Sequence, residues 1–352
     1  MFSTTLLMVV FQMKVFGIHF APLNVPLERR LQTLAAAAWM ITMAFGGYTC
    51  LFIALYTLIF TRLWWLTALY LFWIWMVDVE VSEKGGRPRQ WVRSWMWWRY
   101  TRDYFPLRFQ RLPCVDLDPK RNYLFCCFPH GMLSTGAFNA FGTVYGGYGS
   151  LFPNHTPHVV TLSQHYIMPF FRELALSLGG ISASAKSIEH VLGIPGGGHV
   201  CVLMVGGAAE AYYCKPGNYT LILKNRKGFV KIALRNGTPL VPVLSFGETD
   251  LFDQLEGSFL RTAQEKVRKW IGIAPAVPVG RGFFQYSFGI IPRRNPVTTV
   301  VGKPIEVPKI ENPTKDLIDE YHQKFIEKLT EMFEEQKYNY LDKPEDKKLI
   351  IC

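Results

Sequence analysis

Sequence patterns that mark several common enzyme classes are missing from this chain of 352 residues. It contains no G-x-x-x-x-G-K-[ST], G-x-G-x-x-G or G-x-S-x-G sequence, which disfavours nucleotide-cofactor enzymes and serine hydrolases. Its seven cysteines form no C-x-x-C pair and have no histidines at metal-ligand spacing. We therefore expect reduced thiols, no metal site and no bound cofactor.

Acidic residues are fewer than basic ones, and the formal net charge is +11. Helix-turn-helix, zinc-finger and RNP patterns are absent, so we expect no nucleic-acid partner and favour an anionic membrane surface or an acidic ligand. The first residues are apolar but have neither a basic start nor a small-residue cleavage site, so no signal peptide is expected.

Charge is nearly absent from one long segment, because the 44 residues from Leu34 to Val77 contain a single charged residue, Arg62. One bilayer crossing needs about 20 apolar residues, so the segment predicts a two-helix transmembrane hairpin with a tight reversal. One long helix and a re-entrant loop are the alternatives. We expect a cytosolic segment over 1–33, the hairpin over 34–77 and a membrane-associated cytosolic domain over 78–352.

Basic residues stand on both sides of this apolar segment. Arg29 and Arg30 precede it, and eight basic residues follow between Lys84 and Arg111, with Asp103 as the one acidic residue among them. Positive charge on both flanks places both ends in the cytosol. Tryptophan and tyrosine are interleaved with the later group, which predicts a helix at the membrane interface that contacts membrane lipids. An ordinary core helix with one solvated face is the alternative.

From about Asn122 the sequence changes to short apolar runs that alternate with helical stretches. Continuous Val, Ile and Leu runs are typical of strands buried on both faces, so the alternation predicts an α/β fold with a mostly parallel sheet flanked by helices. Strands are expected at Tyr123–Phe128, Val159–Leu162, Val200–Val205, Leu221–Leu223 and Leu240–Ser245. Helices are expected at Pro169–Leu178, Lys186–Leu192, Gly228–Asn236 and Ser258–Trp270, with a last packing helix capped by Thr314.

A histidine follows the first of these strands, in the sequence F-P-H-G that contains His130. The strand fixes its backbone, the loop opens to substrate, and a pKa near neutrality suits a general base. The N–H of Gly131 and the hydroxyls of Ser134 and Thr135 are candidates to stabilise an oxyanion. A hydrogen-bonded structural histidine is the alternative.

Two further segments combine charge with glycine. Gly206 and Gly207 follow an apolar strand and lead to Glu210, whose carboxylate could orient a histidine or bind a substrate hydroxyl. An exposed glutamate in a tight turn is the alternative. Lys224, Arg226 and Lys227 precede the helix that begins at Gly228, and such a helix start suits phosphate. A solvated charge run is the alternative there.

These segments together resemble the diacylglycerol acyltransferase type 2 family, which includes monoacylglycerol and wax-alcohol acyltransferases. The resemblance covers roughly residues 21–340 and rests on five segments in order. They are Tyr104-Phe105-Pro106, Phe128-Pro129-His130-Gly131, Gly206-Gly207-Ala208-Ala209-Glu210-Ala211, Arg226-Lys227-Gly228-Phe229 and Val241–Glu248. The family's His-Pro-His-Gly motif begins here with Phe128, which leaves His130 as the retained base. The wider superfamily has Asp five residues after that histidine, where this chain has Thr135, so Glu210 is the candidate substitute.

The resemblance implies a glycerolipid acyltransferase-like fold and an O-acyltransferase that esterifies the hydroxyl of diacylglycerol or monoacylglycerol. It implies His130 and Glu210 as catalytic residues, acyl-CoA as co-substrate, and neither a covalent acyl-enzyme nor a metal. The residues expected to contact substrate are Tyr104, Phe105, Pro106, Phe128, Pro129, Gly131, Ser134, Thr135, Gly206, Gly207, Arg226, Lys227 and Gly228.

The expected location is the endoplasmic reticulum membrane, with the acyltransferase domain facing the cytosol. Another lipid alcohol as acceptor and a non-catalytic lipid-binding scaffold are the alternatives. Lipid-droplet targeting and a homo-oligomer are left open.

Overall fold

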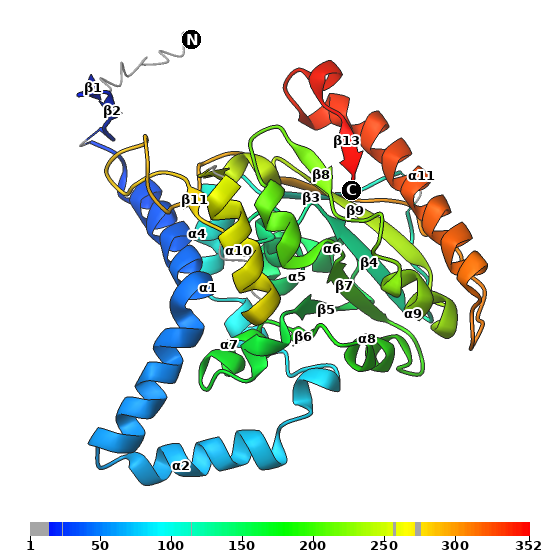
Figure 1. Ribbon diagram of the computed structural model, residues 1–352, viewed down its shortest axis with the longest axis horizontal. Coiled ribbons are helices and arrows are strands. Elements are labelled where there is room, and N and C mark those ends of the chain that lie inside the picture. Colours follow the sequence, from blue (N-terminus) through cyan, green and yellow to red (C-terminus); the bar gives the residue numbers. More distant parts are fainter. Residues whose placement is uncertain (1–13, 23, 114, 256–257, 272–275) are drawn as a thin grey trace, which may run out of the picture.

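A seven-stranded sheet forms the centre of the molecule (Figure 1). The structure is a computed structural model that describes residues 14–22, 24–113, 115–255, 258–271 and 276–352. The strand order is β3-β12-β9-β4-β7-β5-β6, and every neighbouring pair is parallel except β12 with β9. The strands are β3 (Arg108–Arg111), β4 (Tyr123–Phe128), β5 (Thr156–Thr161), β6 (Gly180–Ser182), β7 (His199–Met204), β9 (Leu240–Phe246) and β12 (Thr298–Val301). The predicted mostly parallel sheet is confirmed.

Alternate residues of the central strand β4 face two separate hydrophobic cores. Leu124 and Phe128 lie in one core, whereas Phe125 and Cys127 lie in the other, because successive side chains of a strand point to opposite faces. Residues of α8 (Ala185–Leu192), α9 (Gly228–Asn236) and α11 (Lys315–Tyr340) complete the first core. Residues of α5 (Thr135–Gly142) and α6 (Tyr148–Leu151) complete the second. Burial on both faces explains why the strand could be read from an unbroken apolar run.

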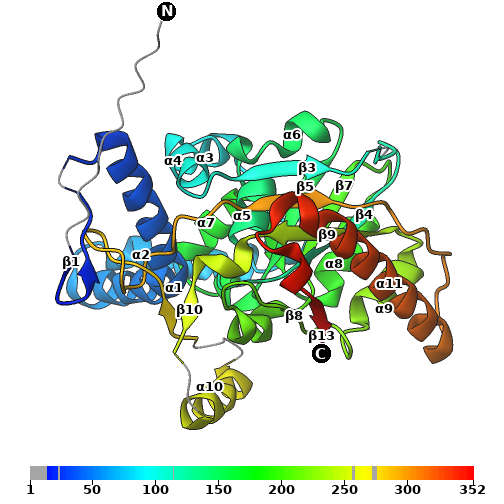
Figure 2. The same ribbon diagram turned by 90° about the horizontal axis from the view of Figure 1, so that it is seen from above.

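The last helix, α11, lies on the side of the molecule opposite α1 in both views (Figure 2). It begins as predicted, because the Thr314 side chain caps it by accepting the Leu317 N–H. Phe325, Leu329 and Phe333 are fully buried at four-residue spacing, so one stripe of the helix packs on the sheet.

One predicted strand belongs to a different sheet. The expected strand at 221–223 overlaps only the end of β8 (Tyr219–Leu221), which pairs in parallel with β13 (Leu349–Ile351) in a separate two-stranded sheet. Leu221 and Leu223 are fully buried, so the apolar pattern is right but does not reveal the partner strand. The remaining elements are β1 (Lys14–Val15), β2 (Ile18–His19), β10 (Asp253–Gln254), β11 (Pro278–Val279), α3 (Gln90–Arg93), α4 (Met96–Tyr104), α7 (Phe171–Ser177) and α10 (Ser258–Ile271), together with short 3₁₀ turns.

The long apolar segment forms one long helix and one short helix. α1 (Leu27–Phe60) has 34 residues and is long and apolar enough to cross a membrane. α2 (Trp64–Phe72) continues as a π-helical turn to Val77, and these residues span only roughly 20 Å, less than a hydrocarbon core of about 30 Å. α2 also turns away from α1 (Figure 1). The long helix indicates membrane association, but the predicted two-pass hairpin is not confirmed.

The two halves of α1 have different surroundings. From Gln32 to Met40 most side chains are buried, and Trp39 stacks on Phe138 of α5 with ring centroids 3.8 Å apart. Large apolar side chains of the half from 41 to 60 are exposed. The helix begins at Leu27, directly after Pro26 and before the apolar run starts, and its first half packs on the folded domain.

The basic, tryptophan-rich segment after α2 is broken into α3 and α4 instead of forming one helix. Trp91 is 65% exposed, whereas Trp98 is buried against Trp39 with ring centroids 5.6 Å apart. The segment thus combines exposed rings with rings that hold α4 on α1. Its placement at a membrane interface stays a prediction.

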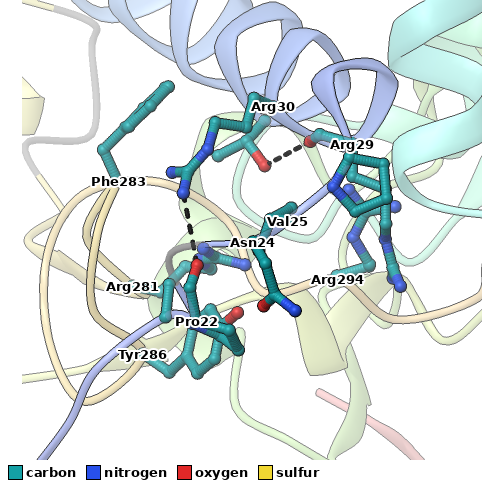
Figure 3. A pocket seen from close by; sticks show the side chains of 12 residues that line it. Pro22, Asn24, Val25, Arg29, Arg30, Arg281, Phe283, Tyr286 and Arg294 are labelled. Atoms are coloured by element: carbon teal, nitrogen blue, oxygen red, sulfur yellow. Dashed lines mark hydrogen bonds between the residues drawn. The ribbon is translucent and has the colours of Figure 1, made fainter. Parts of the chain in front are cut away.

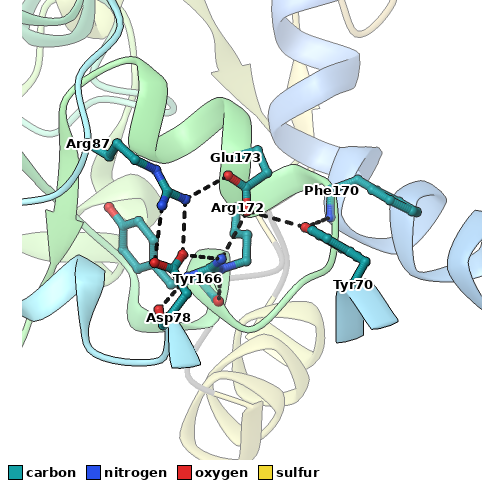
Figure 4. Close-up of polar contacts among 7 residues, drawn as sticks. All are labelled: Tyr70, Asp78, Arg87, Tyr166, Phe170, Arg172 and Glu173. Atoms are coloured by element: carbon teal, nitrogen blue, oxygen red, sulfur yellow. Dashed lines mark hydrogen bonds and ion pairs between the residues drawn. The ribbon is translucent and has the colours of Figure 1, made fainter. Parts of the chain in front are cut away.

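A network of ion pairs attaches the end of the short apolar helix to α7 (Figure 4). Arg87 bonds both carboxylate oxygens of Asp78, at 3.1 and 3.0 Å, and also reaches Glu173 at 3.0 Å. The nearly fully buried Arg172 bonds Asp78 and Glu173, each at 2.9 Å. The hydroxyl of Tyr70 donates to Glu173 at 3.3 Å. These contacts fix α2 relative to α7.

Tyr70→Phe is expected to weaken this attachment. The hydroxyl also accepts the Phe170 N–H at 2.9 Å, so its removal should lower the free energy of unfolding by about 0.5–1.5 kcal/mol. Thermal unfolding of the purified full-length chain in detergent measures the loss. Tyr56→Phe is the matched control, because Tyr56 on α1 is 51% exposed. Equal effects of the two substitutions would argue against a docking role for Tyr70.

Candidate active site

The carboxyl ends of four parallel strands bring the candidate residues to one edge of the sheet. β4 leads to His130, β5 to His165, β7 to Glu210 and β9 to Glu248. These strands are neighbours in the order β9-β4-β7-β5 and run in parallel, so their carboxyl ends meet at the same edge. His130 and Glu210, 80 positions apart in sequence, come into direct contact there.

The ring of His130 is fixed through one of its two nitrogens. Its Nδ1 lies 3.1 Å from the carbonyl oxygen of Gly131. A carbonyl can only accept, so Nδ1 carries the proton, and the lone pair of Nε2 is left for a substrate. Burial lowers the pKa of His130 below its usual value, although the Gly131 contact acts in the opposite direction. The ring is therefore neutral near pH 7, which is the form that accepts a proton.

Glu210 is buried and supports the main chain around His130. One carboxylate oxygen accepts the His130 backbone N–H at 2.6 Å, and the other accepts the Ile222 N–H at 2.8 Å. Glu210 was expected to contact the imidazole ring of His130, but its carboxylate bonds the backbone N–H groups instead. Burial raises the pKa of Glu210 to about 7, although the two N–H donors and Arg226 act to lower it. A Cβ atom on Gly206 would overlap this carboxylate, so the preceding glycine makes room for it.

Glu248 is a second buried carboxylate of the same kind, and sequence reasoning assigned it no role. Its two oxygens accept the N–H groups of Thr135 and Gly136 at 2.8 and 2.7 Å, at the start of α5. Burial raises its pKa to about 7, with these donors acting in the opposite direction. A Cβ on Gly131, whose φ is +59°, would lie 2.6 Å from the Glu248 side chain. Its place in the sequence could have indicated this role, because Glu248 follows a buried strand shortly after it ends, as Glu210 does.

An apolar cavity of ≈ 580 Å³ opens beside His130. α1 contributes its wall from Trp39 to Tyr48, and α7 contributes Phe171, Leu174 and Ala175. Polar side chains are few, and Ser134, Thr161, Gln164 and His165 are among them. Burial lowers the pKa of His165 to about 4, so this ring is also neutral. The cavity therefore suits a long apolar chain with one reactive polar end at His130.

Several residues expected to contact substrate lie outside this cavity. Tyr104 and Phe105 are fully buried in a core beside α1, and the Tyr104 hydroxyl donates to the Pro292 carbonyl at 2.6 Å. Pro106 is exposed, with a φ of +27°. Phe128 packs toward α11, with its ring 6.1 Å from that of Phe325. Pro129, between Phe128 and His130, is buried. The buried side chains among them, those of Tyr104, Phe105 and Phe128, belong to the cores around the site.

The residues proposed to stabilise an oxyanion are in part already bonded. The Ser134 hydroxyl donates to the His130 carbonyl at 3.1 Å, and the Thr135 side chain hydrogen bonds to Glu248. Ser134 and Gly207 do line the cavity. The Gly131 N–H has no hydrogen bond to another described residue, although Gly131 is not among the residues that line the cavity.

The basic turn before α9 is only partly available to a ligand. The Lys227 ammonium forms a 2.6 Å ion pair with Asp319 of α11. Arg226 is exposed and near enough to Glu210 to lower the pKa of that carboxyl. Gly228 is the first residue of α9, with open space around its Cα. In the described part of the chain no three His, Cys, Asp or Glu side chains are grouped to hold a metal ion.

Comparison with known proteins identifies the family. The sequence model for diacylglycerol acyltransferases matches residues 56–352. A 2-acylglycerol O-acyltransferase 1 from Bos taurus is 46% identical over 95% of this chain and 99% of its own length. A diacylglycerol O-acyltransferase 2 from Dictyostelium discoideum is 41% identical over 93% of this chain and 97% of its own. An acyl-CoA wax alcohol acyltransferase 2 from Homo sapiens is 38% identical over 91% and 96%.

Among solved structures, the 1-acyl-sn-glycerophosphate acyltransferase PlsC from Thermotoga maritima aligns with 86% of this chain and 96% of its own, with a TM-score of 0.38 and 13% identity. The sequence relatives decide the assignment, because they cover nearly the whole chain. The resemblance read from the five motif segments is confirmed, and the chain belongs to the diacylglycerol acyltransferase family of acyltransferase enzymes.

Proposed function

We propose that this enzyme transfers an acyl group from acyl-CoA to the free hydroxyl of a mono- or diacylglycerol, with His130 as general base. The observation that carries the proposal is the His130 ring beside an apolar cavity, with Nδ1 bonded to the Gly131 carbonyl. Relatives named as acting on 2-acylglycerol and on diacylglycerol support this choice of acceptors.

The chemistry needs one proton acceptor and no covalent enzyme intermediate. Nε2 of His130 takes the hydroxyl proton as the acceptor oxygen attacks the thioester carbonyl carbon. The Gly131 N–H is the proposed donor to the oxyanion that forms. As that intermediate collapses, the carbon–sulfur bond breaks, and the imidazolium returns the proton to the CoA sulfur. The product is an ester plus free CoA, and the histidine is neutral again.

Glu210 acts in this proposal as a positioning residue. Its bonds to the His130 and Ile222 N–H groups hold the end of β4 against the segment after β8. The imidazolium that forms during the reaction is stabilised when a negative carboxylate lies nearby. Glu210 therefore supports the base through the main chain, and through its charge when the carboxyl is ionised.

The cavity also fits a membrane-supplied substrate. Phe45 and Tyr48 of α1 line it and are each more than half exposed on the helix surface. The wall of the cavity is thus continuous with the apolar half of α1. An acylglycerol dissolved in the bilayer can reach His130 along this face without crossing water. Location in the endoplasmic reticulum membrane, with the domain in the cytosol, is part of the proposal.

An acceptor panel tests the proposal. Microsomes containing the full chain are given labelled acyl-CoA with 2-monoacylglycerol, diacylglycerol, a long-chain alcohol or retinol, and the labelled esters are separated. We expect the two acylglycerols to be esterified faster than either alcohol. A higher rate with the long-chain alcohol would favour the alternative suggested by the wax-alcohol relative. No ester from any acceptor would favour a lipid-binding scaffold.

A further inference from the structure

A second cavity lies at the start of α1 and is strongly positive (Figure 3). It measures ≈ 410 Å³, and its lining includes four arginines and no acidic residue. Arg29 and Arg30 come from the first turn of α1, whereas Arg281 and Arg294 come from segments on either side of a loop before β12. We call these residues the arginine pocket. The proposed chemistry at His130 does not use it.

Three of the four arginines in the pocket have no carboxylate partner among the described residues. Arg29, Arg281 and Arg294 form no ion pair with any described acidic residue. Instead, Arg294 donates to the Gln32 side chain at 2.6 Å and packs over the ring of Tyr104 at 4.4 Å. Burial, then repulsion from Arg29 and Arg281, lowers the pKa of Arg294. An anion bound between these groups would relieve that repulsion.

The geometry of the pocket suits phosphate oxygens. Guanidinium groups offer paired N–H donors that match phosphate, and aromatic packing limits their freedom before a ligand arrives. Arg281 packs over the ring of Tyr286 at 4.3 Å, which orients a second guanidinium in this way. The start of α1 adds backbone N–H groups, because its N-cap residue Pro26 supplies no side-chain acceptor. Phosphate is therefore the anion class that these donors recognise.

Along α1 the arginine pocket and the reactive cavity follow one another. Thr33 lines the pocket and Met40 lines the cavity beside His130, so the two sites are separated by about 10 Å of helix. Beyond Met40 the helix lines the apolar cavity as far as Tyr48. An acyl-CoA has the same order of parts: phosphates, a pantetheine arm of roughly 14 Å when extended, the thioester and the acyl chain.

We propose that the arginine pocket binds the phosphate groups of the CoA part of the acyl donor, an inference that rests on the proposed function. The pantetheine arm then spans the distance between the pocket and His130, and the acyl chain fills the apolar cavity. A phospholipid headgroup offers the same phosphate chemistry. However, the pocket lies at the end of α1 that packs on the domain, away from the exposed apolar half, which favours the soluble ligand.

The test measures binding of free CoA to the full chain in neutral phosphatidylcholine nanodiscs. Arg29→Gln and Arg281→Gln should each weaken CoA binding by about tenfold or more, because each removes charge-assisted bonds to phosphate. For dephospho-CoA, which lacks one phosphate group, the same variants should cause a smaller loss of binding affinity. Arg89→Gln is the matched control, because Arg89 is exposed and lies outside both cavities. Arg29 is exposed as well, so its substitution should not impair folding.

Two further variants separate this inference from its competitors. His130→Ala should bind CoA like the unmodified chain even though its rate of ester formation falls by roughly 10²–10⁴-fold, so failure of the proposed chemistry would be seen separately. Arg226→Gln tests the basic turn before α9. If Arg226→Gln weakens CoA binding and the pocket variants do not, the inference is overturned. The inference is also overturned if the pocket variants bind CoA normally but lose affinity for phosphatidic acid included in the nanodisc lipid. The pocket would then hold a lipid headgroup.

Discussion

Replacing His130 by alanine should lower the rate of acyl transfer by roughly 10²–10⁴-fold, the usual contribution of a general base. The substitution leaves the acceptor hydroxyl with no group to take its proton, because the two buried carboxylates at this edge, Glu210 and Glu248, already bond the main chain. The loss should appear in kcat, since the cavity that binds the apolar chains is unchanged. Initial rates with labelled acyl-CoA and saturating diacylglycerol measure it.

The control for this variant is His190→Ala, because His190 is an exposed histidine on α8 away from the cavity. It should retain full activity at equal protein amounts. His130→Gln preserves a polar side chain of similar reach but cannot act as a base near neutral pH. Near-normal rates for both His130 variants would reject the base assignment.

The pH dependence provides a second test of the same residue. The base must be neutral, and burial lowers the pKa of His130, so kcat/KM should be maintained from neutrality down through about pH 6.5 and fall at lower pH. The raised pKa of Glu210, about 7, predicts a different midpoint if its ionisation controls activity. If kcat/KM falls below about pH 7 in the unmodified chain, and this fall disappears in Glu210→Gln, then ionisation of Glu210 controls the activity instead of His130.

The sheet, and the meeting of His130 and Glu210 at its edge, could be predicted because both depend on short-range patterns. β4 and α9 have the bounds expected from sequence, since a strand buried on both faces must be apolar at every position. His130 and Glu210 each follow such a strand, and parallel strands bring their carboxyl ends together. The role of Glu210 was harder to predict, because the choice between a ring nitrogen and a backbone N–H depends on local geometry that spacing does not describe.

The features that could not be predicted depend on contacts between distant segments. The apolar run from 34 to 77 fits two crossings by length, but the first turns of α1 pack on the domain and only the second half is exposed. Arg29 was read as a charge flanking the membrane. Its position beside Arg281 and Arg294 arises from folding over more than 250 residues, which no local pattern indicates.

Glu248→Ala is expected to have the largest effect on stability near the site. The carboxylate is the only described partner of two backbone N–H groups, those of Thr135 and Gly136, and it is 1% exposed. Each buried N–H left without an acceptor costs about 1–3 kcal/mol, so the variant should lose about 2–6 kcal/mol of unfolding free energy. Thermal unfolding of the purified chain in detergent measures this loss as a lower midpoint.

Glu248→Gln distinguishes hydrogen bonding from simple packing. The amide has the same shape but one of its two ends is a donor, so it can satisfy only one N–H and must face the other with its own hydrogens. Its stability should therefore fall between those of the unmodified chain and Glu248→Ala. Glu306→Gln is the matched control, because Glu306 forms an exposed ion pair with Arg121, and such pairs contribute about 0–1 kcal/mol.

The same variants link stability to catalysis. The Ser134 N–H bonds the His130 carbonyl at 2.9 Å, so the start of α5 and the histidine form one connected loop. If Glu248 anchors that loop, Glu248→Gln should lower kcat more than it raises KM, even at temperatures where the protein is fully folded. An equal stability of Glu248→Gln and the unmodified chain would show that the two N–H groups find other acceptors, and the loop would then need a different anchor.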